Sequence, residues 1–439
     1  MRILRRYAEG ADYLDDLLEM ELRRGALAPA DRGLVQELAF GVVRWQATLD
    51  WLIAQKTAYR PQKPVLQILL RLGLYQLFWL ERIPDHAAVH ETVEMARRLG
   101  FNSQAGFLNA LLRGYLRERE QTEAKLEELR LHHPALGYSH PDWLVKRWQQ
   151  RWGEENTRRL LEWNNTPPVT FARLNTLKAD AASLAQQWQN EGVQFVPRQW
   201  DWTGADEVFE LKSHPPLASL ASFQQGLFYI QDPSTLLAVQ ILGPQPGESL
   251  LDICAAPGGK TTLIAQQIQN QGHILAQDIS PTRLDLVRQN CDRLGVTCVQ
   301  TSLLAGMAQE RGPSPGQPRR SDQTAPGPSA PPFDRVLVDA PCSNTGVMRR
   351  RVDLRWRVRP EELERLRRMQ LELLQRAAMQ VKAGGTIVYS TCSLEPEENR
   401  QVVDEFLAAH PGFRLTQERT LLPFVEGVDG AYLAQLRLD

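Results

Sequence analysis

The sequence contains few cysteines and no long hydrophobic run. Only five cysteines occur among 439 residues, and all lie in the C-terminal half: Cys254, Cys291, Cys298, Cys342 and Cys392. An odd number without Cys-x-x-Cys pairs argues against a disulfide framework and against a zinc site. We therefore expect reduced thiols and no bound metal.

Membrane and secretion signals are also missing. The longest apolar stretch, residues 66–80, contains an arginine and a glutamine and is shorter than the ~20 residues that a membrane-spanning helix requires. Arg2, Arg5 and Arg6 are followed by polar and acidic residues, unlike a secretory signal. A net charge of −1 neither requires nor excludes a nucleic-acid partner, because a basic surface can be local. We expect a cytoplasmic protein with no membrane partner.

The first half of the chain predicts two different domains. Residues 1–130 carry apolar positions at helical spacing and no strand-type alternation, which predicts an all-α bundle. Residues 140–235 combine strand-like and helical segments, which predicts a small α+β (RRM-like) module. The segments that carry this second prediction are 169–174, 181–190 and 193–196.

Residues 236–439 predict a Rossmann-like domain with a parallel, doubly wound α/β sheet, because short apolar strands alternate with helical stretches. The predicted strands are 250–253, 274–276, 296–299, 335–338 and 385–390. One connection is rich in proline, glycine, serine and charged residues, and we expect a disordered insertion there, near 306–332. The chain is therefore expected to be a multidomain protein.

A glycine-containing turn follows the first of these strands, and its residues are Cys254, Ala255, Ala256, Pro257, Gly258, Gly259 and Lys260. Such a turn lets backbone N–H groups and a helix N-terminus approach an anionic ligand. A plain strand-to-helix turn is one alternative. A P-loop is another, but that motif requires a glycine where Cys254 stands. The third is a Rossmann-like cofactor site.

An acidic residue after the second strand favours the cofactor site. Asp278 stands roughly twenty residues beyond the glycines, where a carboxylate commonly accepts bonds from ribose hydroxyls. Residues 278–283 then open the next helix, with Ser280 as a candidate N-cap and Arg283 as a further candidate cofactor contact.

Two cysteines end neighbouring predicted strands, in Asp339-Ala340-Pro341-Cys342 and in Thr391-Cys392-Ser393. The carboxyl ends of such strands form the rim where ligands bind. One reaction that uses such a thiol is methyl transfer to cytosine. A thiolate that attacks C6 of cytosine makes C5 nucleophilic enough to accept a methyl group. Asp339 could hydrogen-bond the base edge and also contact the cofactor. The alternative is that both cysteines are small buried hydrophobes.

These motifs resemble the RNA cytosine-5 methyltransferases of the Sun/NOL/NOP family. The resemblance implies S-adenosylmethionine as cofactor, Cys392 as the covalent nucleophile and Cys342 as an aid to product release. Residues 40–44, 72–77, 86–89 and 107–113 are similar to the NusB-like RNA-binding domain of the bacterial RsmB/Sun subgroup. That subgroup methylates the cytosine at position 967 of 16S rRNA, which implies 16S rRNA or its assembly intermediate as partner. We expect a monomer.

The chain departs from the family pattern at a few positions. Ser302 lies near the place of the usual aspartate beside the adenine, and Asn344 stands where small residues are common. A run of arginines follows the Cys342 loop and is either a solvated face or an RNA phosphate site, which we favour. The candidate RNA-binding residues are Arg349, Arg350, Arg351 and Arg355. We expect Trp356 to pack in the core.

Two other classes of function remain open. A non-catalytic RNA-binding or ribosome-assembly protein could retain a methyltransferase-like fold, and a P-loop enzyme that hydrolyses nucleotides is a more distant alternative. Cys342, Cys392, Lys260 and Asp278 argue against a protein that only binds RNA.

Overall fold

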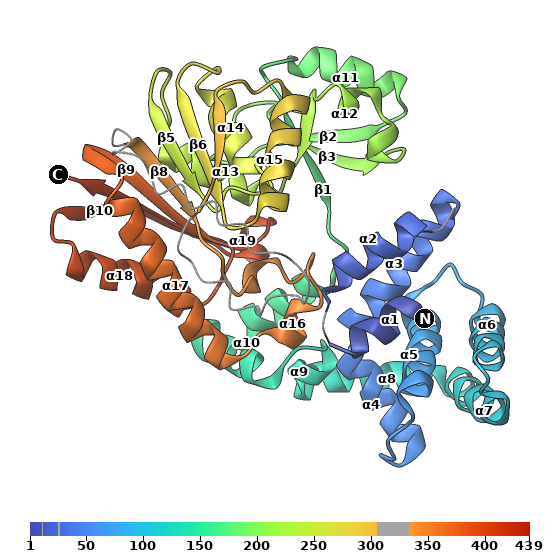
Figure 1. The fold of residues 1–439 in the computed structure, drawn as a ribbon. Coiled ribbons are helices and arrows are strands. Elements are labelled where there is room, and N and C mark those ends of the chain that lie inside the picture. Colours follow the sequence, from blue (N-terminus) through green and yellow to red (C-terminus); the bar gives the residue numbers. More distant parts are fainter. Residues whose placement is uncertain (11, 25–26, 305–332) are drawn as a thin grey trace, which may run out of the picture. The chain divides into compact units, whose positions relative to one another are not determined.

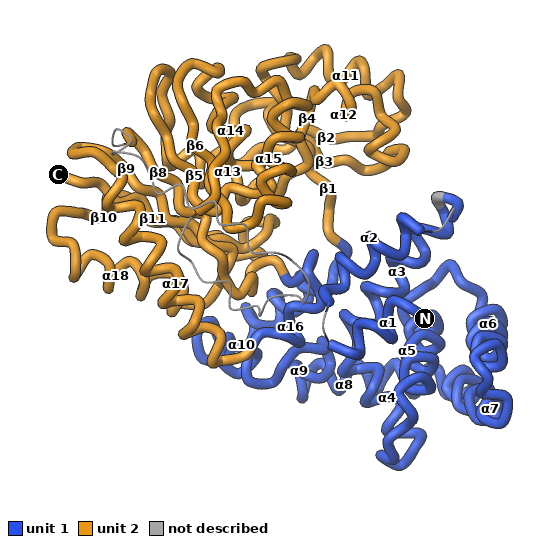
Figure 2. The backbone as a smooth tube through the Cα atoms, viewed as in Figure 1, with its two compact units in different colours: residues 1–167, 348–358 blue, residues 168–347, 359–439 orange. Residues whose placement is uncertain are grey.

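The computed structural model describes residues 1–10, 12–24, 27–304 and 333–439. The predicted insertion at 306–332 lies outside these residues. The chain forms two compact units (Figure 2), the first built from Met1–Pro167 and Met348–Val358, the second from Pro168–Val347 and Arg359–Asp439. Residues 348–358, near the middle of the C-terminal half, thus belong to the first unit. Among the described residues, no helix is long and apolar enough to span a bilayer.

The first unit is helical, as predicted (Figure 1). Leu14, Leu17, Leu18 and Leu22 are all buried on one face of α2, which confirms their helical spacing. The helices are α1 (Arg2–Ala8), α2 (Leu14–Arg24), α3 (Pro29–Arg44), α4 (Gln46–Thr57), α5 (Pro64–Trp79), α6 (Asp85–Arg98), α7 (Asn102–Arg117), α8 (Arg119–His132), α9 (Pro134–Gly137), α10 (Asp142–Asn165) and α16 (Leu354–Arg357).

Helix α5 lies at the centre of this unit and is buried around most of its circumference. Its neighbours pack against it so closely that two glycines are required. A Cβ on Gly73 would lie 2.8 Å from Leu112 Cδ1, and one on Gly41 would lie 1.9 Å from Tyr75 Cζ. Because such distances are far below van der Waals contact, an alanine at either position would force the facing side chain, Leu112 or Tyr75, to move.

The second unit begins with a small α+β module, as predicted. Its four-stranded sheet has the order β2-β3-β1-β4. Trp188 of the main helix packs between Phe195, Phe209 and Phe228, which form the aromatic core beneath the sheet. The elements are β1 (Thr170–Leu174), α11 (Ala181–Asn190), β2 (Gln194–Arg198), β3 (Val208–Ser213), η1 (Leu217–Ser219), α12 (Ala221–Gln224) and β4 (Phe228–Ile230).

A seven-stranded sheet of order β10-β11-β9-β8-β5-β6-β7 forms the rest of this unit. Five strands are parallel, as expected. The third begins at Val299, where the predicted strand 296–299 ends. An antiparallel pair at one edge was not predicted. The strands are β5 (Ser249–Ile253), β6 (His273–Asp278), β7 (Val299–Leu303), β8 (Phe333–Asp339), β9 (Val381–Thr391), β10 (Phe413–Leu421) and β11 (Ala431–Leu438).

Helices cover both faces of this sheet, so its strands are buried on two sides. One face packs against α13 (Ser234–Leu242), α14 (Gly259–Gln267) and α15 (Pro281–Leu294); the other packs against α17 (Pro360–Ala378) and α18 (Arg400–Ala409). Shorter elements are η2 (Thr345–Val347), η3 (Pro396–Glu398) and α19 (Pro423–Glu426). The strand order reverses between β5 and β8, so the carboxyl ends of β5, β6, β8 and β9 form the edge at which α/β sheets bind ligands.

Candidate active site

The glycine turn lies between β5 and α14, at the predicted place. Gly258 has φ +102° and caps the N-terminus of α14. A Cβ on Gly258 would lie 3.3 Å from Val287 Cα, so the left-handed backbone and the close approach of α15 both favour glycine there. The turn thus brings a helix N-terminus to the sheet edge.

A buried arginine that the sequence patterns did not reveal supports this turn. Arg173 of β1 is 1% exposed and donates to Gly259 O at 2.9 Å, Gln231 Oε1 at 2.5 Å and Thr262 Oγ1 at 3.2 Å. Burial lowers the pKa of its guanidinium to about 10. The available signal was an arginine inside an otherwise apolar strand, which is costly unless its N–H groups find acceptors. Arg173 fixes the start of α14 against the small α+β module.

The structure brings Asp278 to the same turn. Its carboxylate, 1% exposed, accepts from the N–H groups of Ala256 at 3.3 Å and Ser280 at 3.2 Å. Arg283 lies 3.5 Å from Asp278 Oδ2 and donates to Ala256 O at 2.8 Å. Ser280 Oγ accepts from the N–H of Arg283, which confirms Ser280 as the N-cap. The predicted cofactor residues around Asp278 therefore converge.

An ion pair links the turn to the fourth parallel strand. Lys260 Nζ lies 2.6 Å from Asp339 Oδ2, and Ser390 Oγ donates to Asp339 Oδ1 at 2.8 Å. Burial opposes the charge of Lys260, but the neighbouring carboxylate outweighs it and raises the pKa of this lysine. Asp339 keeps about a third of its side chain exposed (34%), so it remains within reach of a ligand.

A second carboxyl group lies beneath the turn. Asp252 is fully buried and accepts from Thr261 Oγ1 at 2.6 Å through Oδ2. Burial raises its pKa to about 7, and the negative charge of Asp339 adds to the effect. No described group bonds its second oxygen, Oδ1.

The two thiols lie together at the carboxyl ends of β8 and β9. Cys342 Sγ and Cys392 Sγ are 3.2 Å apart, and Cys392 Sγ also lies 2.9 Å from Asn344 Oδ1. The hydrogen bond to Cys392 and burial raise the pKa of Cys342. Cys392 is partly exposed. The sequence prediction that both cysteines would lie side by side at the sheet edge therefore agrees with the geometry.

The loops that carry these thiols share a buried carboxylate. Glu398 Oε1 accepts from the N–H of Ser343 at 2.8 Å and from Gln370 Nε2 at 3.1 Å. Glu398 Oε2 accepts from the hydroxyls of Ser343 and Ser393. Burial raises the pKa of Glu398, although the hydroxyl donors oppose this. Glu398 thus ties together the residues that directly follow both cysteines, a role that the sequence did not suggest.

The other three cysteines have no part in the thiol pair. Burial raises the pKa of Cys254, of Cys291 (to about 12) and of Cys298. Among the described residues, no group of side chains could hold a metal ion.

The predicted phosphate contact by the arginine run is wrong for two residues. Arg355 is completely buried in the helical unit and donates to the carbonyls of Arg44 (3.3 Å), Ser139 (3.2 Å), Asn164 (3.1 Å) and Met348 (3.3 Å) and to Asn165 Oδ1 (2.9 Å). Arg349 is 2% exposed, and its guanidinium lies 3.9 Å from the centre of the Trp163 ring. Both side chains therefore hold residues 348–358 in the helical unit.

The other two arginines of the predicted set are accessible to solvent. Arg350 is partly exposed and Arg351 is exposed. Trp356 packs against the helical core and donates to Val43 O at 2.8 Å, which confirms the expected packing role.

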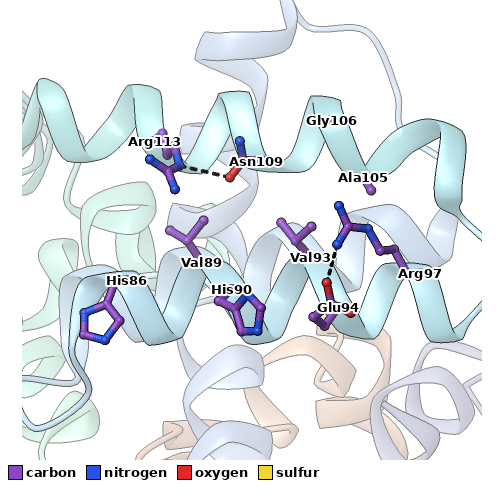
Figure 3. Close-up of a pocket in the computed structure, with 10 residues that line it drawn as sticks. All are labelled: His86, Val89, His90, Val93, Glu94, Arg97, Ala105, Gly106, Asn109 and Arg113. Carbon is purple, nitrogen blue, oxygen red and sulfur yellow. Dashed lines mark hydrogen bonds and ion pairs between the residues drawn. The ribbon is translucent and has the colours of Figure 1, made fainter.

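A groove of about 240 Å³ lies in the helical unit between α6 and α7 (Figure 3). His86, His90, Arg97 and Arg113 contribute to its walls. Arg97 is paired with Glu94 and Arg113 donates to Asn109, so both guanidinium groups already have partners (Figure 3). The groove is polar and contains none of the thiol or glycine-turn residues.

Three family models match the chain. The model described as 16S rRNA methyltransferase RsmB/F matches residues 239–437, the NusB family model matches residues 1–117, and a model for the ferredoxin-like domain of RsmF/B-like methyltransferases matches residues 140–204. Together with the observed sheets, these matches confirm the predicted fold class of helical bundle, small α+β module and Rossmann-like domain.

Relatives match nearly the whole chain. The probable ribosomal RNA small subunit methyltransferase B of Bacillus subtilis is 34% identical over 97% of this chain and 94% of its own length. The ribosomal RNA small subunit methyltransferase B of Vibrio cholerae is 36% identical over 93% of this chain and 90% of its own length.

Solved structures show the same fold. The crystal structure of PH0851 has a TM-score of 0.77 at 24% identity and covers 98% of this chain and 96% of its own. A methyltransferase homolog from Pyrococcus horikoshii has a TM-score of 0.56 at 30% identity, covering 70% of this chain and 97% of its own. The chain, matched along nearly its full length, belongs to the RsmB/F family of 16S rRNA methyltransferases.

Proposed function

We propose that this protein transfers a methyl group from S-adenosylmethionine to C5 of a cytosine in 16S rRNA, at position 967 by family resemblance, through a covalent bond between Cys392 and C6. The observation that carries the proposal is the thiol pair. Cys342 and Cys392 lie 3.2 Å apart at adjacent strand ends, in the same unit as the glycine turn and the Lys260–Asp339 ion pair. A protein that only binds RNA has no need of two juxtaposed thiols.

The side chains at this site have the charges and the hydrogen-bonding groups that suit the proposed cofactor. When bound, S-adenosylmethionine supplies an electrophilic methyl group on a positively charged sulfonium. The unbonded Asp252 Oδ1 offers an acceptor for the ammonium group of the cofactor, and Asp278 offers a carboxylate for ribose hydroxyls. Arg283 lies against Asp278, so we propose that this half-exposed side chain covers the ribose site and moves aside when the site is filled.

The thiols and Asp339 then have separate tasks. Cys392 forms the bond to C6, which makes C5 nucleophilic. Asp339, held by Lys260 and Ser390, accepts hydrogen bonds from the base edge of the cytosine. After methylation the C5 proton must leave so that the bond between Cys392 and C6 can break. We assign to Cys342, whose sulfur lies 3.2 Å from Cys392 Sγ, the task of assisting this release of the product.

The RNA contacts are proposed for surfaces that remain accessible. Arg350 and Arg351 replace the original set of four arginines as candidate phosphate contacts, and the histidine-lined groove between α6 and α7 is a further candidate in the NusB-like unit. We propose that the protein acts as a monomer in the cytoplasm on 16S rRNA or an assembly intermediate.

Bisulfite mapping of rRNA tests the proposal. Cells that lack the protein should lose one 5-methylcytosine in 16S rRNA, and wild-type protein should restore it while Cys392→Ala should not. Cys298→Ala, a cysteine distant from both strand ends in the sequence, is the matched control and should restore it. An unchanged set of methylated cytosines would favour the non-catalytic assembly function.

A further inference from the structure

Asn344 connects the two thiol loops in an unusual backbone conformation. Its φ is +59°, in the left-handed region that asparagine tolerates better than most residues. Its Nδ2 donates to Cys342 O at 2.7 Å, and its Oδ1 lies 2.9 Å from Cys392 Sγ. The amide therefore bridges the backbone of one cysteine and the side chain of the other.

The direction of this bridge is fixed by its partners. Cys342 O is a carbonyl and can only accept, so the amide nitrogen must face it and the amide oxygen must face Cys392. An amide oxygen has no proton to donate. The contact between Asn344 and Cys392 is therefore a hydrogen bond only while Cys392 carries its proton, and a thiolate at this place would be repelled by the oxygen.

The contact between the sulfurs completes a ring. Because the proton of Cys392 points to Asn344, the 3.2 Å contact between the two sulfurs requires a proton from Cys342. Three hydrogen bonds then follow one another: Cys342 to Cys392, Cys392 to Asn344, and Asn344 back to Cys342 O. The raised pKa of Cys342, caused first by its hydrogen bond to Cys392, agrees with Cys342 as the donor.

Charged groups around the ring have opposite effects on the formation of a thiolate. The ammonium of Lys260, which is paired with Asp339, interacts favourably with a negative charge on the Cys392 sulfur. The charge of Glu398 opposes a thiolate at Cys342. All three groups remain in place when residue 344 is changed, so a variant there isolates the effect of the amide.

We propose that Asn344 is a positioning residue that holds Cys392 as a protonated thiol in the absence of RNA. This inference rests on the proposed function in treating Cys392 as the nucleophile. The ring orients the sulfur of Cys392 between Cys342 and Asn344 and keeps it unreactive. The nucleophile forms only when the hydrogen bond from Cys392 to the amide oxygen of Asn344 is broken.

The experiment measures alkylation of Cys392 by iodoacetamide in the full chain without RNA or cofactor. Mass spectrometry follows the modification from about pH 6 to about pH 10, the range over which a thiol becomes a thiolate. Asn344→Gly removes the acceptor and suits a left-handed backbone, and we expect the midpoint of reactivity to fall by about 0.5–1 pH unit. Asn344→Asp puts a negative charge beside the sulfur, and we expect the midpoint to rise.

Asn270→Gly is the matched control, because Asn270 also has a left-handed φ (+58°) but its amide contacts Gly295 O, Thr297 N and Cys298 Sγ instead of Cys392. Its profile should equal that of the wild type. A midpoint in Asn344→Gly that is unchanged or higher would overturn the inference, as would a lower midpoint in Asn344→Asp. Because the reaction uses neither RNA nor cofactor, it is independent of methyl transfer, and bisulfite mapping tests the proposed function separately.

Discussion

The hydroxyl groups of Ser343 and Ser393 lie 3.1 Å apart, one residue beyond each of the two cysteines. Both bond to Glu398 Oε2, and Glu398 Oε1 accepts the N–H of Ser343. The same glutamate is held from the strand side, where Tyr389 Oη donates to Glu398 O at 2.5 Å. The spacing of the two thiols therefore depends on a carboxylate that touches neither sulfur.

Replacing Glu398 by alanine should lower both stability and turnover. The N–H of Ser343 and Nε2 of Gln370 would lose this buried acceptor, which costs about 1–3 kcal/mol for each group left unpaired. Displacement of the thiol loops should lower kcat about tenfold to a hundredfold. Urea unfolding and a methyl-transfer assay measure the two effects.

The conservative variant separates positioning by Glu398 from a need for its charge. Glu398→Gln keeps an oxygen for Ser343 and Gln370, and its amide can donate to the serine hydroxyls, so most activity should return. Glu397→Gln, at the neighbouring position, is the control. Equal losses in the alanine and glutamine variants would contradict a positioning role that depends on shape and hydrogen bonding.

The two active-site cysteines should give opposite results when covalent RNA adducts are separated on denaturing gels. Cys392→Ala should form no adduct, because no thiolate is present to attack C6. Cys342→Ala should form the adduct and release it slowly, because the thiol that assists product release is missing. Cys298→Ala should behave as the wild type. An adduct in Cys392→Ala would identify a different nucleophile.

Arg355 and Arg351 should respond differently although they lie four residues apart. Arg355→Met removes the guanidinium that donates to the carbonyls of both Ser139 and Asn164, and we expect a loss of at least about 3 kcal/mol of unfolding free energy. Arg351→Ala, at an exposed position, should change stability by less than about 0.5 kcal/mol.

RNA binding provides the second comparison for these arginines. Arg351→Ala should weaken binding and reduce the salt dependence by about one unit of slope, because one phosphate contact is lost. Filter binding at several salt concentrations measures this. An unchanged slope would remove Arg351 from the RNA surface.

The sequence predicted those parts of the site that depend on short stretches of chain. The turn at Gly258 and the cysteines at two strand ends follow from local patterns, because a buried strand, a turn and a helix are encoded by neighbouring residues. Arg173, Glu398 and Arg355 could not be found in this way. Each bonds groups far away in the sequence, and only Arg173, which interrupts an apolar strand, carries a local sign of burial.

The arginine run shows why charge alone is a poor predictor of solvent exposure. Arg349, Arg351 and Arg355 are nearly equivalent in the sequence, but the segment is embedded in the helical unit and only some of its side chains can reach water. The edge pair β10 and β11 was also missed, since most side chains of β10 are exposed and no continuous apolar run marks this strand.

The buried carboxyl of Asp252 should make stability depend on pH. Its pKa is about 7 in the folded protein, above the usual 3.8. The folded state therefore retains the proton while the unfolded state loses it, so this stabilising contribution is complete below about pH 4 and is lost as the pH rises toward 7. Asp252→Asn has no ionisable group at this position. Its unfolding free energy should therefore rise relative to that of the wild type as the pH increases from about 4 to about 7.

The gain should amount to a few kcal/mol at most, at about 1.4 kcal/mol for each unit of pKa shift, and it should level off above pH 7. Urea unfolding from pH 5 to about pH 8 measures it, with Asp285→Asn at an exposed position as the control. A difference that does not change with pH would mean that Asp252 is already ionised at pH 5. Asp252→Asn should also weaken binding of S-adenosylmethionine, because the proposed acceptor for the ammonium group of the cofactor loses its negative charge.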